Sequence, residues 1–184
     1  MGTRNGVPTP SSMVADNDYA VGKLVEAVSS SPFWKETAIC ILEDDAQAGI
    51  DHVDAHRSTA YVISPFIQKG KIDSTFYNTD SMLRTMELLL GMPPMSQYDA
   101  VANPLAIFDS RVVNSEPFVA IKPSREIVCQ VNSKTAYRSK DSEKIPRYSE
   151  ESDIDEELND ILWKSIKGRD SRTPTPRYGM AVRK

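Results

Sequence analysis

The sequence predicts an α/β fold, because two short apolar strands lie between two amphipathic helices along the chain. Segments 37–42 and 59–64 are continuous runs rich in β-branched residues, which is typical of strands buried on both faces. Apolar residues recur at helical spacing from Val21 to Val28 before these strands, and again over 79–90 after them. The order helix, strand, strand, helix is that of an α/β domain.

The first helix is expected to follow an extended lead-in over residues 1–13, which are rich in Gly, Pro, Ser and Thr. Asp16 or Asn17 is expected to cap this helix, because a short side-chain oxygen can accept hydrogen bonds from the free N–H groups at a helix start. Residues at positions i, i+3, i+4 and i+7 form one stripe on a helix. The predicted buried stripe comprises Val21, Leu24, Val25 and Val28.

The second helix is predicted to span Thr79 to Leu90. Thr79 is the expected N-cap, and Gly91, which is followed closely by two prolines, is the expected stop. Its inward-facing residues are predicted to be Leu83, Met86 and Leu90.

The pattern weakens after about residue 103. Segments 118–121 and 126–129 are predicted to be edge strands or docking segments, and the polar, highly charged stretch 133–151 is predicted to be a linker. A last helix is expected to begin at a cap on Ser152 and to end at Gly168. The predicted organisation is therefore an α/β unit over 1–132, a linker over 133–151, and a C-terminal helix and tail over 152–184.

Composition argues against two classes of protein. A net charge of -4 argues against a general nucleic-acid-binding protein, which usually has a basic face. No stretch approaches the roughly 18 apolar residues of a membrane span, and no signal peptide is visible at the N-terminus, so the compartment stays open. The two cysteines give no disulfide framework, and Cys40 is expected to be a small buried hydrophobe.

Acidic and histidine residues are concentrated just after the first predicted strand. Segment 43–56 contains four aspartates, one glutamate and both histidines of the chain. Adjacent carboxylates repel one another unless a cation compensates them, and a divalent metal accepts both carboxylate oxygen and imidazole nitrogen. The predicted metal ligands are Asp44, Asp45, His52 and His56. The alternative is a solvated acidic turn or a helix cap, which is a common feature after a strand.

Two flanking residues have open roles. Glu43 is expected to point opposite to Asp44 on an extended chain, so it either supports the site indirectly or is structural. Arg57 is the candidate substrate-binding residue, because its guanidinium can donate two hydrogen bonds to a phosphate. It could equally neutralise the neighbouring acids.

The pair Asp44-Asp45, followed by Asp51-His52-Val53, resembles the phosphoesterase family that includes bacterial phospholipases C and acid phosphatases, within the alkaline phosphatase superfamily. In that family a strand ends in Asp-Glu or Asp-Asp, and a glycine-bearing turn leads to Asp-His-Val. The helical segments 15–25 and 81–94 are similar to the helices that flank this motif in the family. The resemblance covers about residues 8–100, with a weaker likeness over 155–168.

The resemblance implies a three-layer α/β sandwich with buried central strands and flanking helices. It also implies hydrolysis of phosphate monoesters or diesters, in which a Ser or Thr nucleophile forms a phospho-enzyme and a divalent metal (Zn, Mn or Ca) polarises the phosphoryl group. Asp44 and Asp45 would be the metal pair, with His52 and His56 as further ligands or phosphate donors. Family members are often exported.

Two departures from the family pattern matter. The family's nucleophile and its acidic metal ligand come from a region before the helix at Val21, so this chain is expected to lack them and no catalytic residue is identified in it. Thr79 stands where many phospholipase-type members have a histidine. The expected partners are a phosphate-ester substrate and the missing N-terminal half of the domain. The rival hypothesis is a non-catalytic α/β scaffold for binding or assembly.

Overall fold

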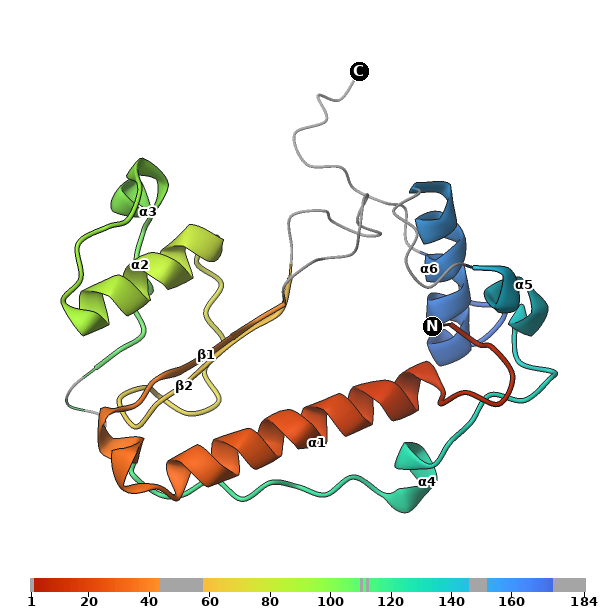
Figure 1. Cartoon of the computed structure of the whole chain (residues 1–184), viewed down its shortest axis with the longest axis horizontal. Helices are drawn as coiled ribbons and strands as arrows, with labels where there is room; N and C mark the ends of the chain where they lie inside the picture. The colour runs from red at the N-terminus through yellow and green to blue at the C-terminus, as the bar shows by residue number, and fades with distance from the viewer. Residues whose placement is uncertain (1, 44–57, 110, 112, 146–151, 174–184) are drawn as a thin grey trace. The chain divides into compact units, whose positions relative to one another are not determined.

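The structure, a computed structural model, describes residues 2–43, 58–109, 111, 113–145 and 152–173 (Figure 1). The chain divides into two compact units, one made of residues 1–26, 43–58 and 119–184 and the other of residues 27–42 and 59–118. Each unit is described by itself. The elements in chain order are α1 (Pro10–Ser29), η1 (Pro32–Glu36), β1 (Ile39–Leu42), β2 (Ala60–Ile63), α2 (Thr79–Leu90), α3 (Gln97–Val101), α4 (Arg125–Val128), α5 (Ser139–Lys144) and α6 (Ser152–Lys167).

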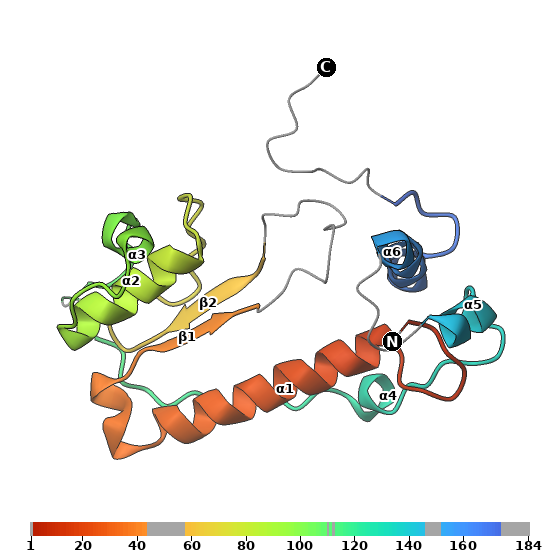
Figure 2. The same ribbon diagram turned by 45° about the horizontal axis from the view of Figure 1, so that its top comes forward.

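The fold is mixed α/β, and both predicted strands form. Strands β1 and β2 pair in antiparallel orientation, and Figure 2 shows them side by side. The prediction that both strands are buried on both faces is wrong. Every residue of β1 is half-buried, and Ala60 and Tyr61 of β2 are exposed. Within the described residues the sheet contains only these two strands, which leaves much of their surface uncovered.

Helix α1 begins earlier than predicted. Thr9 caps it, because its hydroxyl accepts the backbone N–H of Ser12 at 3.1 Å, and Pro10 occupies the first helical position, where its missing N–H costs nothing. Asp16 and Asn17 are therefore inside the helix, and the cap predicted there is wrong. The predicted stripe is partly confirmed, since Val25 is buried while Leu24 is 54% exposed.

Helix α2 has the predicted bounds, but a different cap and a different buried face. The N-cap is Asn78, whose side chain accepts the backbone N–H of Ser81 at 2.9 Å, and Gly91 ends the helix in the left-handed region with φ 66°. The buried residues are Ser81, Met82, Thr85 and Glu87. Met86 and Leu90 of the predicted inward stripe are exposed, so that prediction is wrong.

The polar residues on the buried face of α2 are satisfied by specific partners. The Thr85 hydroxyl donates to the Ser81 carbonyl at 2.7 Å and accepts the backbone N–H of Leu105 at 2.8 Å. A buried hydroxyl with such partners avoids the cost of an unpaired polar group. Hydrogen bonding therefore allows a polar face, rather than the apolar stripe, to be the inner side of this helix.

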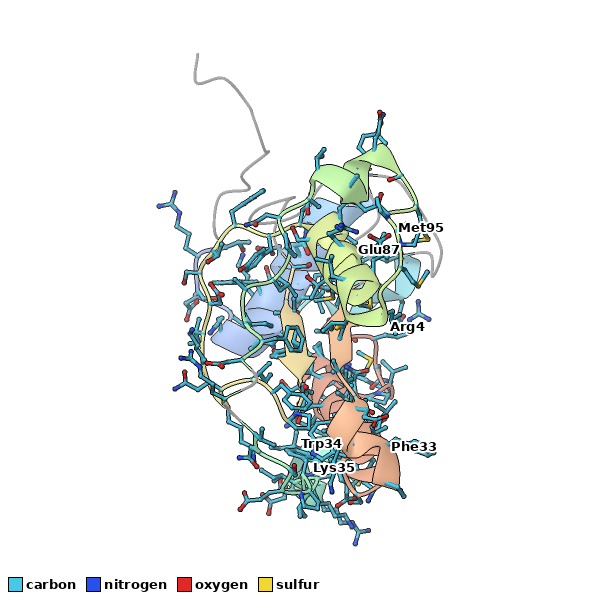
Figure 3. All side chains as sticks on the ribbon, turned by 90° about the vertical axis from the view of Figure 1, so that its left-hand side faces the viewer. Arg4, Phe33, Trp34, Lys35, Glu87 and Met95 are labelled. Carbon is cyan, nitrogen blue, oxygen red and sulfur yellow. The ribbon has the colours of Figure 1, made fainter. Side chains whose placement is uncertain are left out.

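Two buried carboxylates connect α2 to α3. Glu87 is 2% exposed and Asp99 is 1% exposed, and the backbone N–H of Met95 donates to both, at 3.2 Å and 2.7 Å. Figure 3 labels Glu87 and Met95. The Arg84 guanidinium forms an ion pair with Glu87 at 3.2 Å. Hydrogen bonds from the Ser96 hydroxyl and from the Met95 N–H keep the pKa of Asp99 far below its ordinary value, although burial opposes them.

The other unit contains α4, α5 and α6. Residues 125–128 form the short helix α4, and 118–121 contain no strand, so the predicted edge strands are wrong. Helix α6 has the predicted bounds, with Ile161 fully buried and Gly168 in the left-handed region beyond its end.

Helix α5 lies within the segment predicted to be a linker, and its buried Ser142 accepts the Thr3 N–H at 3.1 Å. The division into domain, linker and tail stays a prediction.

Replacing Glu87 with alanine is expected to destabilise the α2–α3 unit by about 1–3 kcal/mol, because the largely buried Arg84 guanidinium loses its ion-pair partner. Urea unfolding followed by circular dichroism measures the change. The matched control is Glu116→Ala, which removes an 83% exposed carboxylate 3.7 Å from Lys69 and is expected to have no measurable effect. Equal midpoints for the two variants would contradict a stabilising role for the buried pair.

Candidate functional site

All five residues of the predicted site lie outside the described residues. The four predicted metal ligands and Arg57 fall within 44–57, so the arrangement of these side chains remains a prediction. The structure does describe the two strands from which this segment leaves and to which it returns. The positions of β1 and β2 therefore show where the candidate segment begins and ends.

Both ends of the candidate segment are held at one edge of the β1–β2 sheet. Leu42, the last residue of β1, is the direct antiparallel partner of Ala60, the first residue of β2. Residues directly opposite each other in such a pair have Cα atoms about 4.5–5.5 Å apart. Residues 43–59 therefore form the connection between two adjacent strand ends. Hairpin connections usually contain about 2–5 residues, and connections as long as this one are commonly functional.

This geometry differs from the one that the sequence suggested. The expectation was that acids collect at the carboxyl edge of buried strands in an open α/β sheet, where ligands bind. In the antiparallel pair, the carboxyl end of β1 meets the amino end of β2 instead. Asp44 and Asp45 follow the first end and His56 and Arg57 precede the second, so the hairpin ties the two halves of the candidate set to the same edge.

The described residues offer no second candidate for a metal centre. No group of three or more His, Cys, Asp or Glu side chains that could hold a metal occurs among them. The buried pair of Glu87 and Asp99 already has Arg84, Ser96 and the Met95 N–H as partners. Glu43, which is described, is exposed where β1 ends, and its role stays open. Thr79 is exposed in the first turn of α2.

Cys40 is the described reactive group nearest in sequence to the candidate segment. It lies in the middle of β1, opposite Val62, and is half-buried rather than fully buried. Partial burial raises the pKa of its thiol, because the thiolate is poorly solvated there. Cys129, in contrast, is exposed. Cys129 is therefore the more accessible of the two thiols, and Cys40 is both shielded and slow to form the nucleophilic thiolate.

Residues 8–93 match the family model described as the phosphoesterase family. The match spans slightly less than half of the chain, and it covers α1, both strands, the candidate segment and α2. No curated protein shows significant similarity to the chain. The family match supports phosphoester hydrolysis as the chemistry to which this part of the chain is related. Across the part of the chain that the structure describes, none of the helices combines the length and apolarity needed to cross a bilayer.

Alkylation of the two cysteines should reflect their different surroundings. At pH 8 we expect iodoacetamide to modify Cys129 faster than Cys40, because the raised pKa of Cys40 leaves less thiolate at that pH. Peptide mass spectrometry over a time course measures both rates in one sample. The Cys40 rate should rise as the pH is increased above 8, because a larger fraction of this thiol is then ionised. Identical rates and pH profiles would show that β1 does not shield its thiol.

Proposed function

We propose that this chain carries the metal-binding part of a metal-dependent phosphoesterase that hydrolyses phosphate monoesters or diesters. The supporting observation is that the matched region, residues 8–93, includes the whole acid- and histidine-rich segment. The β1–β2 pairing adds support, since it tethers both ends of this segment to one edge. Chain length limits Asp44 to about 7 Å and Arg57 to about 11 Å from the paired strand ends.

The donor set suits a divalent cation. Asp44 and Asp45 would hold the ion through carboxylate oxygens, and His52 and His56 would add imidazole nitrogens. Mixed oxygen and nitrogen donors suit Zn²⁺ or Mn²⁺, whereas Ca²⁺ prefers oxygen alone. When bound, such an ion supplies Lewis-acid polarisation of the phosphoryl oxygens. Arg57 would orient the phosphate through two parallel N–H donors.

The proposed reaction uses a Ser or Thr nucleophile that forms a phospho-enzyme, and we place this nucleophile outside the present sequence. Thr9 lies just before α1 and Ser12 lies in its first turn, on the N-terminal side of Val21, and the hydroxyl groups of both already have partners. The Thr9 hydroxyl donates to the Gln130 side chain at 2.9 Å and caps α1, and the Ser12 hydroxyl donates to the Val128 carbonyl at 2.6 Å. These contacts support structural roles for both residues.

The same proposal extends to the fold. A two-stranded sheet is marginal in water, and stability usually requires three or more strands or a covering layer. A nucleophile-bearing half would supply the half-exposed strands β1 and β2 with additional strands and with a covering layer. The result would be the three-layer sandwich typical of the alkaline phosphatase superfamily. In this proposal residues 1–132 form part of that domain, 133–151 connect it to the last helix, and the activity needs both halves.

Metal binding should depend on Asp45. Calorimetric titration with Zn²⁺, Mn²⁺ or Ca²⁺ is expected to detect binding that weakens at least about tenfold in Asp45→Ala, because ligand number sets the affinity. The matched control is Asp18→Ala, which removes an exposed carboxylate on α1 and should leave the affinity unchanged. If both variants bind as the unaltered chain does, the chain is better described as the non-catalytic scaffold.

The chain alone should not hydrolyse p-nitrophenyl phosphate with any of these three metals, because metal activation without a nucleophile does not give a phospho-enzyme. A spectrophotometric assay with an authentic phosphatase as the positive control measures this. Turnover that disappears in Asp45→Ala would contradict the assignment of the nucleophile to another segment. It would at the same time support the metal site itself.

A further inference from the structure

The N-terminal segment, residues 2–9, is bound by residues 128–145, which lie far away along the chain. The backbone N–H of Gly6 donates to the Asn132 carbonyl at 2.9 Å, and the Asn132 N–H donates to the Val7 carbonyl at 2.9 Å. Both segments belong to the same compact unit. The expected extended lead-in is therefore paired, backbone to backbone, with part of the segment that was expected to be a linker.

The Asn132 side chain makes the N-terminal segment curl around it. Its amide group donates to the Gly2 carbonyl at 3.3 Å and to the Pro8 carbonyl at 3.2 Å, so both of its N–H donors have acceptors. The side chain is buried. Left-handed backbone at Gly2 and Gly6, with φ of 76° and 75°, allows the chain to turn tightly enough for one amide group to reach residues 2 and 8.

Helix α5 covers the first residues of this segment, which is drawn in red beside α5 in Figures 1 and 2. Thr3 is 1% exposed; its N–H donates to the Ser142 hydroxyl at 3.1 Å, and its own hydroxyl donates to the Tyr137 carbonyl. The Arg4 guanidinium donates to the carbonyl groups of Ser142 at 3.3 Å and of Ile145 at 3.5 Å. The carbonyl groups at the end of a helix have no partner within it, so Arg4 stabilises the end of α5.

Residues 128–130 hold the start of α1. The backbone N–H of Thr9 donates to the Gln130 carbonyl at 3.0 Å, and the Thr9 hydroxyl donates to the Gln130 side chain at 2.9 Å. In the first turn of the helix, the Ser12 hydroxyl donates to the Val128 carbonyl at 2.6 Å. The family match begins at Pro8 and ends well before Val128. A part of the chain outside the family-related region therefore holds the beginning of that region.

We propose that residues 128–145 are a clasp that holds residues 2–12 and thereby fixes where α1 begins. The side chains buried in this clasp are polar: Thr3, Ser12, Asn132, Ser139 and Ser142. Hydrogen bonds depend on direction and distance, whereas apolar contacts do not, so a polar clasp accepts the N-terminal segment in one register. The clasp is independent of the proposed metal site, because none of its residues lies in 43–57.

Hydrogen exchange of the full chain, followed by mass spectrometry, tests the clasp through Asn132→Asp. Aspartate has nearly the size of asparagine, but it directs a carboxylate toward two carbonyl oxygens and loses both donors. We expect amide exchange at least about tenfold faster in peptides covering residues 2–14 and 128–145, with exchange in α2 unchanged. The control is Asn17→Asp, the same chemical change at an exposed position of α1, which should leave exchange in all three regions unchanged.

Two glycine variants measure how closely the N-terminal segment fits against α5. A Cβ atom at Gly2 would lie 2.8 Å from the Ser142 hydroxyl oxygen, whereas a Cβ atom at Gly6 would have no neighbour within 4 Å among the described residues. Both glycines have nearly the same left-handed φ, so alanine costs a similar backbone strain at either position. Gly2→Ala should therefore accelerate exchange in α5 several-fold more than Gly6→Ala does.

Three results would overturn the proposal. The first is exchange at residues 2–14 and 128–145 that is the same in Asn132→Asp as in Asn17→Asp, and the second is equal effects of the two glycine variants. The third is acceleration that extends equally to α2, because the contacts would then stabilise the whole chain rather than the start of α1. Metal binding and hydrolysis test the proposed function separately, so either proposal can fail without the other.

Discussion

Antiparallel hydrogen bonding between β1 and β2 places Leu42 opposite Ala60 and so fixes where the acid- and histidine-rich segment begins and ends. Without this pairing, Asp44 and Asp45 would be separated from His56 and Arg57 by a connection free to span a large distance. With it, the entropic cost of bringing the two ends together is already met by the strands. A site built from this segment would therefore start from two ends that backbone pairing already holds together.

The sequence predicted both strands correctly but not their surroundings, and the physical reason is the range of the interactions involved. Residues 37–42 and 59–64 show a local preference for extended backbone, which is visible in β-branched composition. Pairing direction and burial depend on what lies beside and above the strands, and a local pattern does not contain that information. The five predicted site residues came from composition and resemblance, and they lie outside the described residues, so they stay a prediction.

The helices show the same contrast: their ends depend on local sequence and were largely predictable, whereas their buried faces depend on residues distant in the sequence. The bounds of α2 and α6 were predicted because Gly91 and Gly168 end them locally, through left-handed backbone that glycine adopts easily. The start of α1 was missed because residues 1–13, including Pro10, were interpreted as an extended lead-in, although proline is also favoured in a first helical turn. The buried face of α2 was predicted wrongly because the polar partners of Thr85 and Glu87 come from residues 95–105, which periodicity within the helix does not register.

Charge balance links the hairpin to the proposed chemistry. Segment 43–57 contains five acidic residues and one arginine, so with neutral histidines it carries a formal charge equal to the entire net charge of the chain, -4. The rest of the molecule is balanced, and the excess is concentrated between two adjacent strand ends. Like charges confined in this way favour the compensation that a divalent cation provides. Because imidazole binds a metal only when neutral, the cation and the proton would compete for His52 and His56, and cation affinity should increase as the pH rises through the histidine range.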